Sequence, residues 1–214
     1  MGGGRRPRDR EGMTSGQVHG DLDVDAANLT TYAAAVGVRA ATPVTVTHLV
    51  GRAVARGLLA VPELRTAGTD VFFADRGVTV ERVDDKPVTE VARELAAAAR
   101  APGTQPVGPA VVLTSAEDGF TRAYEPLPEA GGVTVLVVVG AVSQRPVAIE
   151  GRVVIRPVLT LTATFDRDRV DGRRAAAFAA AVREYCAHPE AFEPPGDAGE
   201  QPAGGSRSDA RSSG

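Results

Sequence analysis

The residues best suited to chemistry lie in one short segment near the C-terminal end of the sequence. The run from Asp166 to Gly172 reads DRDRVDG, so three carboxylates and two guanidinium groups follow directly after an apolar stretch. Arg167 can pair with an anion but cannot act as a general base, because the pKa of arginine lies above about 12. Asp168 is an ordinary carboxylate and therefore a weak base toward a thiol. The segment predicts ion pairing, solvation or anion binding at Arg167, and an N-cap of the following helix at Asp171.

The three histidines are the other side chains that change charge near neutral pH. His19 falls in an expected strand, His48 on an expected helix, and His188 in a His-Pro-Glu turn at the end of the last expected helix. Each of them fits a surface or packing residue. The single cysteine, Cys186, excludes an intrachain disulfide, and its place in an amphipathic helix favours burial over a nucleophilic role. We expect no metal site.

The composition is that of a globular protein, with 43% apolar and 24% charged residues. The net charge of −3 argues against nucleic acid or an anionic membrane as the main partner, because phosphate neutralisation needs a concentrated positive face. The basic cluster from Arg5 to Arg10 fits a solvated tail. The longest apolar run, Val133 to Val142, is about half as long as a membrane-spanning helix, and the N-terminus has no signal-peptide core. We therefore expect a cytoplasmic protein without nucleic-acid or membrane partners.

Hydrophobic periodicity predicts one α/β (α+β) domain over residues 15–193, between disordered ends at 1–14 and 194–214. Asp25 is the expected cap of the first helix, and Pro87 the expected first-turn residue of the third. A turn is expected at 143–146. The sheet should be mixed or mostly antiparallel, with the helices packed mainly on one face. Strands are expected at 17–23, 70–74, 78–83, 110–114, 133–141 and 153–165, and helices at 25–36, 43–61, 87–100 and 173–187.

A series of motifs in the C-terminal half carries a family resemblance. A hydrophobic strand ending in Gly140 leads to Arg145-Pro146-Val147, a hairpin glycine at Gly151, the DRDRVDG segment and a helix ending in Pro189-Glu190. These pieces keep their order over about 60 contiguous residues. They resemble the catalytic domain of the dihydrolipoamide acyltransferase component of 2-oxoacid dehydrogenase complexes, in which the corresponding segment reads Asp-His-Arg-x-x-Asp-Gly.

The N-terminal half resembles that family more loosely. HGDLDVDAANL is similar to its first strand and helix, and THLVGRAVARGLLAVPELRT to the helix before its Pro-Glu-Leu turn. Two segments depart from the family pattern. The Gly-Leu-x-x-Pro-Val segment that helps form the substrate channel is reduced to GVTV, starting at Gly77, and the Ser-Asn-x-Gly loop is replaced by Thr114 to Gly119.

The resemblance implies a chloramphenicol-acetyltransferase-like fold and a homotrimer whose active sites lie between subunits. It implies coenzyme A or dihydrolipoamide as a substrate, with no covalently bound cofactor. Arg167 then stands at the position of the catalytic histidine, Asp171 at the position of a residue that makes a structural ion pair, and Thr114 or Ser115 at the position of the oxyanion hydroxyl.

Three functions follow from this resemblance. The first is a catalytically inactive acyltransferase domain, used as a scaffold or regulatory subunit, with other 2-oxoacid dehydrogenase subunits as further partners. Apolar stretches such as Val133 to Val139 would serve its trimer packing. The second is a working acyltransferase that moves acyl groups between coenzyme A and a thiol or amine with a rearranged base. The third is a module that binds coenzyme A or another small molecule in a retained channel, provided that the shortened Gly77 segment leaves one.

Overall fold

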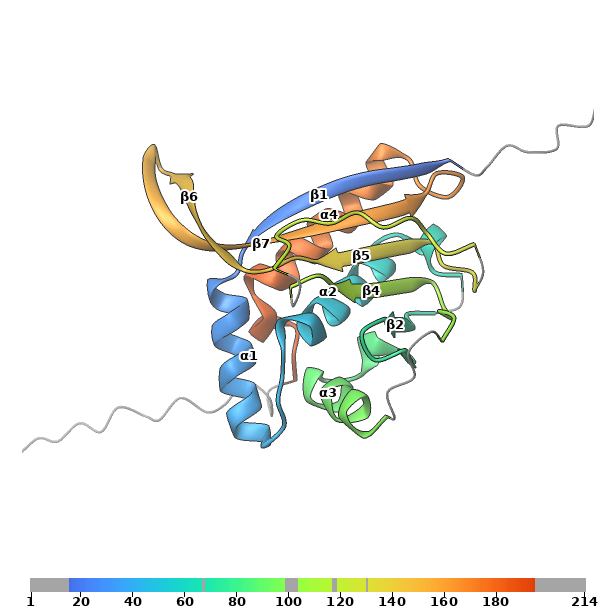
Figure 1. Ribbon diagram of the computed structural model, residues 1–214, viewed down its shortest axis with the longest axis horizontal. Coiled ribbons are helices and arrows are strands. Elements are labelled where there is room, and N and C mark those ends of the chain that lie inside the picture. The colour runs from blue at the N-terminus through green and yellow to red at the C-terminus, as the bar shows by residue number, and fades with distance from the viewer. Residues whose placement is uncertain (1–15, 67, 99–103, 117–118, 130, 195–214) are drawn as a thin grey trace, which may run out of the picture.

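A computed structural model describes residues 16–66, 68–98, 104–116, 119–129 and 131–194 of the chain. Seven strands and four α-helices are found in these residues (Figure 1). Short 3-10 turns lie at Pro62–Leu64, Val83–Asp85 and Pro189–Ala191. The main elements in chain order are β1 (Gln17–Asp25), α1 (Ala27–Ala40), α2 (Val46–Ala60), β2 (Val71–Phe73), β3 (Val78–Val80), α3 (Val88–Ala97), β4 (Ala110–Thr114), β5 (Val135–Val139), β6 (Ser143–Ile149), β7 (Arg152–Asp166) and α4 (Gly172–Ala187).

The strands form one mixed sheet in the order β1-β7-β5-β4-β2-β3. Strand β4 runs parallel to both of its neighbours, β2 and β5, and the other pairs are antiparallel. Strand β7 is long enough to pair with different strands along its two halves. Its second half pairs with β1 and β5, while its first half pairs with β6 in a hairpin that projects beyond the body of the molecule (Figure 1). The expected mixed sheet is confirmed.

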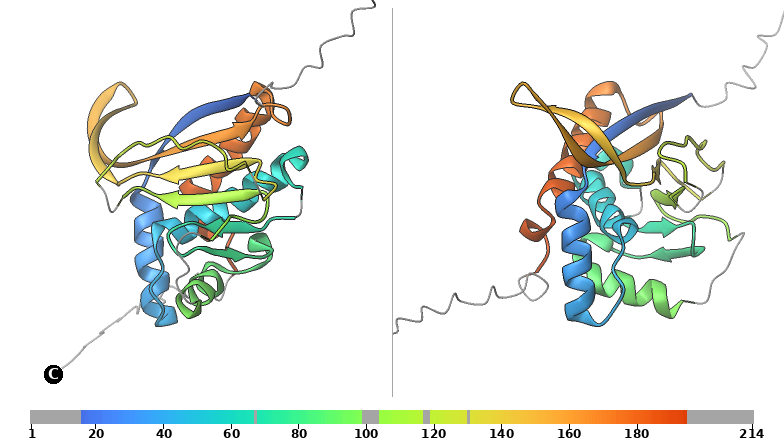
Figure 2. Two further views of the ribbon diagram at one scale, coloured as in Figure 1. Left: turned by 45° about the vertical axis from the view of Figure 1, so that its right-hand side comes forward. Right: turned by 60° about the vertical axis from the view of Figure 1, so that its left-hand side comes forward.

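The helices cover one face of this sheet, as the turned views in Figure 2 show. Helices α2 and α4 pack against each other where Gly57 meets the ring of Phe178, since a Cβ at Gly57 would lie 2.4 Å from that ring. The apolar positions at three- and four-residue spacing in α2 and α4 form the inner side of this layer, as their periodicity predicted. Fully buried members of this core include Leu29, Leu49, Val54, Leu58, Phe73, Leu95, Leu159 and Tyr185.

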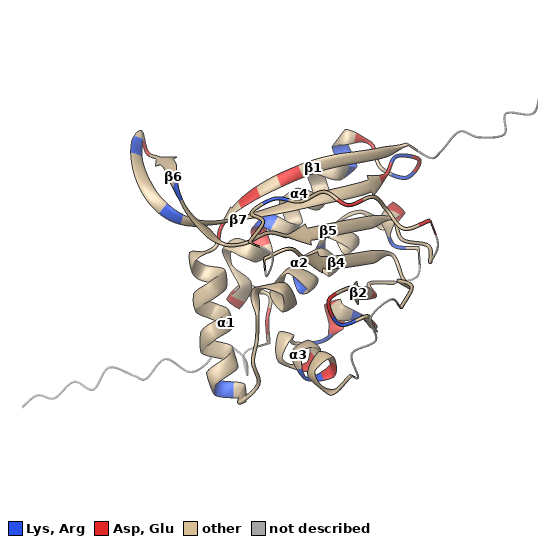
Figure 3. Ribbon diagram, viewed as in Figure 1, with Lys and Arg blue, Asp and Glu red and all other residues tan. Residues whose placement is uncertain are grey.

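The opposite face of the sheet carries a smaller apolar cluster around Leu136 and Val138. The segment 119–129 crosses this face and is held there by hydroxyls of β7. Thr162 donates to the carbonyl of Ala123, and Thr164 donates to the carbonyl of Glu125 at 2.7 Å. The acidic residues along β1 in Figure 3 attach three segments in turn, through the ion pairs Asp21–Arg122, Asp23–Arg145 and Asp25–Arg156.

The first residues of the helices differ from the sequence predictions. The helix expected from residue 43 begins at Val46, because the hydroxyl of Thr45 caps it. Pro87 is the N-cap of α3 and not a residue of its first turn. Asp25 is the last residue of β1, so the cap of α1 is Ala26, although the Asp25 carboxylate accepts a hydrogen bond from the Ala27 amide at 2.9 Å.

Two further predictions were wrong. The turn expected at 143–146 lies inside β6, and the chain reverses at Glu150 and Gly151, whose φ angles are 51° and 75°. Pro146 is tolerated there because β6 is paired on one side only and Pro146 has no amide to leave unpaired. The apolar run Val133 to Val139, expected to pack between subunits, is buried within this chain because β5 lies between β4 and β7. The disorder predicted at 1–14 and 194–214 concerns residues outside the described ranges, except for Pro194, which the structure describes.

A buried ion pair ties the end of the described chain to the helical layer. Glu193 accepts a hydrogen bond from Arg52 of α2 at 2.7 Å and another from the Tyr185 hydroxyl at 2.6 Å, and its second carboxylate oxygen accepts from the Val88 amide at 2.8 Å. Arg52 also donates to the carbonyl of Val83 at 2.6 Å. The side chains of Arg52 and Glu193 are 4% and 0% exposed. Since these charges are removed from water, the network holds only if every member stays paired.

Candidate functional site

Arg167 lies in the turn that joins β7 to α4. Its amide donates to the carbonyl of Gly16 at 3.0 Å, which adds one bond to the ladder between β1 and β7. The Arg167 side chain is exposed and runs over Gly16, where a Cβ would lie 2.9 Å from the Arg167 Cδ atom. Asp166 accepts a hydrogen bond from the amide of Asp168 at 2.9 Å. The turn therefore presents the Arg167 guanidinium outside the core.

Asp171 begins α4, as its sequence position predicted. Its Oδ1 atom accepts from the Arg174 amide at 2.8 Å, and its Oδ2 atom accepts from the Arg174 guanidinium at 3.0 Å. The hydrogen bond from the Arg174 amide, with the arginine charge beside it, lowers the pKa of the Asp171 carboxyl. Arg174 also pairs with Glu63 at 2.9 Å. Asp171 is thus an ionised cap in contact with an arginine.

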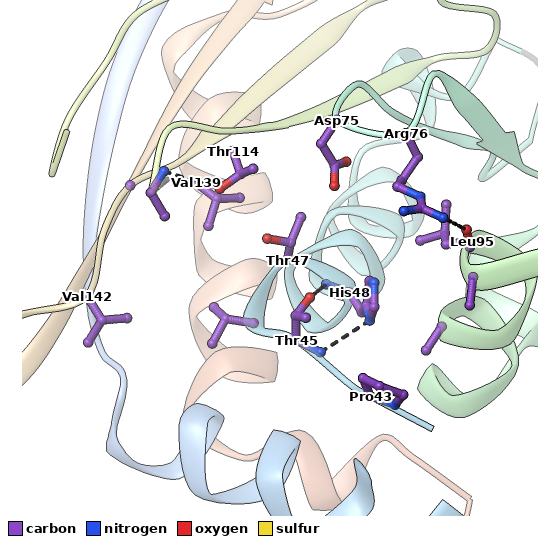
Figure 4. A pocket seen from close by; sticks show the side chains of 15 residues that line it. Pro43, Thr45, Thr47, His48, Asp75, Arg76, Leu95, Thr114, Val139 and Val142 are labelled. Atoms are coloured by element: carbon purple, nitrogen blue, oxygen red, sulfur yellow. Dashed lines mark hydrogen bonds between the residues drawn. The ribbon is translucent and has the colours of Figure 1, made fainter. Parts of the chain in front are cut away.

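Thr114 lies at a different place, in a cavity of about 580 Å³. The cavity is bounded by the start of α2, the turn after β2, helix α3, and the ends of β4 and β5. In Figure 4, Thr114, Val139 and Val142 lie on one side and Asp75 and Arg76 on another. Of the two hydroxyls proposed for an oxyanion site, Thr114 lines the cavity. The buried Ser115 hydroxyl instead donates to the carbonyls of Phe120 and Val139, each at 3.4 Å.

Strand register places Thr114 and Arg167 at opposite ends of the sheet. Thr114 is level with Val139, and Val139 is level with Leu161 of β7. Arg167 follows Leu161 by six residues, and a strand rises about 3.3 Å per residue, so the separation along the sheet is roughly 20 Å. Within one copy of the chain, the turn that holds Arg167 and the cavity that holds Thr114 are two separate places.

Asp75 and Arg76 form the cavity wall opposite Thr114. They lie in a tight turn whose Arg76 and Gly77 amides both donate to the Phe73 carbonyl, with Gly77 at a φ of 69°. Arg76 also donates through Nη2 to the Leu95 carbonyl at 2.8 Å, which attaches the turn to α3. The Asp75 Oδ1 and Arg76 Nε atoms are buried without a hydrogen-bond partner among the described residues. The shortened Gly77 segment thus leaves a cavity, and it leaves polar groups beside it that need partners.

His48 lines the same cavity from the first turn of α2. Its Nδ1 atom accepts a hydrogen bond from the Thr45 amide at 3.2 Å, while the Thr45 hydroxyl accepts from the His48 amide at 3.4 Å. Because an amide donates to Nδ1, the neutral ring carries its proton on Nε2. Burial lowers the pKa of His48 below its usual 6.5, the charge of Asp75 opposes this shift, and the charge of Arg76 adds to it. His48 therefore offers the cavity an N–H donor and no free lone pair.

The other reactive side chains lie away from the cavity. His19 Nδ1 lies 2.9 Å from the Thr164 hydroxyl on the outer face of the sheet, and His188 is exposed at the end of α4. Cys186 is buried, and burial raises its pKa to about 12, so the packing role predicted for it is confirmed. In the part of the chain that the structure describes, no group of His, Cys, Asp and Glu could hold a metal ion. Within the same ranges, no helix combines the length and apolarity needed to cross a bilayer.

The sequence did not predict that His48, Asp75 and Arg76 would meet. One signal for His48 was present: Thr45 and His48 have the three-residue spacing of a capping box, in which the third residue is usually Glu or Gln. A histidine at that position has its ring beside the helix N-terminus and not on the helix face used for packing. The sequence around Asp75 and Arg76 contains no comparable motif, because the turn that holds them lies next to α2 only in the folded chain.

The sequence similarity of this chain to known proteins lies in its C-terminal half. Residues 130–193 match the family model for the 2-oxoacid dehydrogenases acyltransferase catalytic domain. A curated relative from Schizosaccharomyces pombe, a probable dihydrolipoyllysine-residue succinyltransferase component of the mitochondrial 2-oxoglutarate dehydrogenase complex, is 47% identical over 49 residues. That match spans 23% of this chain and 11% of the relative, so only a small part of the relative's length is represented here.

Solved structures extend the likeness to most of the chain. The dihydrolipoamide acetyltransferase of Azotobacter vinelandii superposes with a TM-score of 0.70 at 21% identity, covering 84% of each chain. A chloramphenicol acetyltransferase superposes with a TM-score of 0.53 at 17% identity, covering 79% of this chain and 85% of the other. The resemblance seen in the sequence is confirmed: the chain has the chloramphenicol-acetyltransferase-like fold, and its residues 130–193 match the catalytic domain of the 2-oxoacid dehydrogenase acyltransferases.

Proposed function

We propose that this chain is an acyltransferase-fold protein that does not catalyse acyl transfer and that serves as a scaffold or regulatory subunit. The proposal is carried by Arg167, which the sequence resemblance places at the position of the family's catalytic histidine. In the Azotobacter enzyme, a serine, a histidine and an asparagine were studied for their roles in catalysis, and the asparagine follows the histidine by four residues. Asp171 follows Arg167 by the same number.

Within the residues that the structure describes, none of the three histidines is placed to replace a base at position 167. The neutral His48 ring has its Nδ1 lone pair occupied by the Thr45 amide, and its Nε2 atom carries the proton. His19 and His188 lie outside the cavity. A general base typically contributes about a hundred- to ten-thousand-fold to such a reaction. Its loss alone would slow acyl transfer by about that factor.

Acyl transfer can be tested directly with acetyl-coenzyme A and dihydrolipoamide in a steady-state thiol-release assay. The unmodified protein should show no turnover above the uncatalysed rate. Arg167→His restores the imidazole, but we expect little recovery because the Gly77 and Thr114 segments also depart from the family pattern. Substantial turnover by the unmodified protein, abolished by Asp168→Asn or His48→Gln, would overturn the proposal and identify the replacement base.

The cavity supports a second candidate function, the binding of a coenzyme A type ligand without chemistry. Its volume of about 580 Å³ falls in the range of about 300–1,000 Å³ usual for small-molecule sites. Its lining combines apolar side chains such as Val139 and Leu95 with a few polar ones, among them Thr114 and His48. Calorimetry with coenzyme A separates the two candidates: weak or absent binding fits the scaffold, and tight binding fits the binding module.

Assembly into a homotrimer is part of the same proposal. Two observations support self-association, since the Arg167 turn and the Thr114 cavity could form one site only between copies, and the β6–β7 hairpin exposes 76% of Val153 and 64% of Ile155. Other subunits of a 2-oxoacid dehydrogenase complex are proposed as further partners. Light scattering of the full chain should give a trimer, and a strict monomer at micromolar concentration would remove the support for a site shared between copies.

A further inference from the structure

We infer that His48 is a fixed, neutral hydrogen-bond donor to a carbonyl oxygen of the ligand that occupies the cavity. The inference rests on the second candidate function, ligand binding in the cavity of Thr114. It assigns to His48 a binding role at a position where the sequence indicated only a surface or packing residue.

The tautomer follows from the first turn of α2. An N-terminal helix amide has no partner within its own helix, so the Thr45 amide needs an acceptor. The His48 Nδ1 atom is that acceptor, at 3.2 Å. The Thr45 hydroxyl in turn accepts a hydrogen bond from the His48 amide at 3.4 Å. With a proton on Nδ1, the Thr45 amide and the ring N–H would both be donors and no hydrogen bond could form between them. The pair of bonds therefore fixes both the orientation of the ring and the position of its single proton, on Nε2.

The surroundings favour the uncharged ring. The ring is partly buried and meets Phe73 of β2 edge to face, with 6.5 Å between ring centroids. The charged groups that act on it are Asp75 and Arg76, both in the turn after β2, and they act in opposite directions. The positive end of the α2 dipole adds a further penalty for an imidazolium at this position. A neutral imidazole held in this way at a helix N-terminus is suited to polarising a carbonyl group.

A carbonyl oxygen is the acceptor that fits the Nε2 donor. In Figure 4, the Asp75 and Arg76 side chains lie on the far side of the His48 ring from Thr45, so the group that faces Nε2 lies near both charges. A neutral acceptor is not repelled by the Asp75 carboxylate, and it does not compete with the Leu95 carbonyl for Arg76. Two carbonyl sources exist in a coenzyme A type ligand: the amides of the pantetheine arm and the thioester of its acylated form.

The tautomer is tested first, without ligand, by long-range ¹H–¹⁵N NMR of the full chain. The sequence has three histidines, so His48→Gln and His188→Gln assign the signals. We expect the His48 ring to be neutral with its proton on Nε2 from pH 8 down to at least pH 6.5. A proton on Nδ1, or an ordinary titration near pH 6.5, would overturn the inference.

The ligand arm uses pantetheine and S-acetylpantetheine as probes. In His48→Gln the side-chain oxygen can still accept from the Thr45 amide, as glutamine does in capping boxes, but the amide nitrogen that remains as a donor lies at a different place from the ring Nε2. We expect about three- to tenfold weaker binding by this variant, the range for one neutral hydrogen bond, and no change in the exposed control His188→Gln. An equal loss for both probes identifies a pantetheine amide, and a loss confined to S-acetylpantetheine identifies the thioester.

The outcomes distinguish the two proposals. Probe binding that is unchanged in His48→Gln would overturn the role of His48 and leave ligand binding intact. Binding of neither probe to the unmodified protein would overturn the binding function and, with it, the role of His48, even where the NMR tautomer is as expected. A shift of the His48 Nε2 signal on binding, together with the weaker binding of His48→Gln, supports both.

Discussion

Removal of the Glu193 carboxylate should destabilise the fold more than any surface change. In Glu193→Ala, the Arg52 charge stays buried at 4% exposure without its counterion, and the Tyr185 hydroxyl and Val88 amide lose their acceptor. Breaking a buried ion pair by removing one partner costs about 3–5 kcal/mol, and total stabilities are about 5–15 kcal/mol. At about 2–4 °C per kcal/mol for a chain of this size, the melting temperature should fall by about 6–20 °C.

Urea unfolding followed by circular dichroism measures this loss. Glu190→Ala is the matched control, because it removes the same group from an exposed side chain three residues earlier and should change stability by less than about 0.5 kcal/mol. Glu193→Gln should lie between the two, since its amide keeps an acceptor but loses the charge that matches Arg52. A loss below about 1 kcal/mol in Glu193→Ala would refute the argument, because it would mean that water reaches Arg52.

Three further results are expected. Cys186 should not react with a thiol reagent in the native protein at pH 8, because burial raises its pKa to about 12, and rapid stoichiometric labelling would contradict its packing. Gly57→Ala should cost about 1–3 kcal/mol in urea unfolding, because its Cβ would lie 2.4 Å from the Phe178 ring, whereas Gly172→Ala, with no atom within 4 Å, should be neutral or stabilising. The free energy of unfolding should fall as pH decreases below about 6.5, because the unfolded chain binds a proton at His48 more readily than the folded chain does. In urea unfolding between about pH 5 and 8, the free energy of unfolding should depend less steeply on pH in His48→Gln than in the unmodified protein.

The sequence predicted the elements that follow from local periodicity. The strand at 110–114 was placed at both ends as observed, and β7 within one residue at each end, because long runs of β-branched residues have few alternatives to a strand. Strand β6 was missed because Arg145-Pro146 reads as a turn. Its strand geometry comes from pairing with β7, for example Arg145 with Arg156, which no local pattern contains.

The candidate site divides in the same way. The turn around Arg167 and the cap at Asp171 are local, so the DRDRVDG segment was enough to place them at the end of a strand and the start of a helix. The cavity is not local. It needs the first turn of α2, the turn after β2, and the ends of β4 and β5, which are distant in sequence and meet only through the parallel pairing of β4 with both neighbours. The sequence could therefore predict where Arg167 and Asp171 lie, but not that His48 lines a cavity with Thr114.

The cavity is the feature that makes ligand binding a second candidate function beside the structural role. A buried polar atom without a partner costs about 1–3 kcal/mol, and this cavity has two such atoms beside it, on Asp75 and Arg76. Apolar side chains at these positions would remove that penalty and would also close the space, as a scaffold would permit. The turn instead keeps both charges, with Arg76 anchored to the Leu95 carbonyl and Gly77 in the left-handed conformation that the turn requires. The cavity and the Arg167 turn are separate places in the fold, so the proposed absence of a base at Arg167 is compatible with a ligand in the cavity of the same chain.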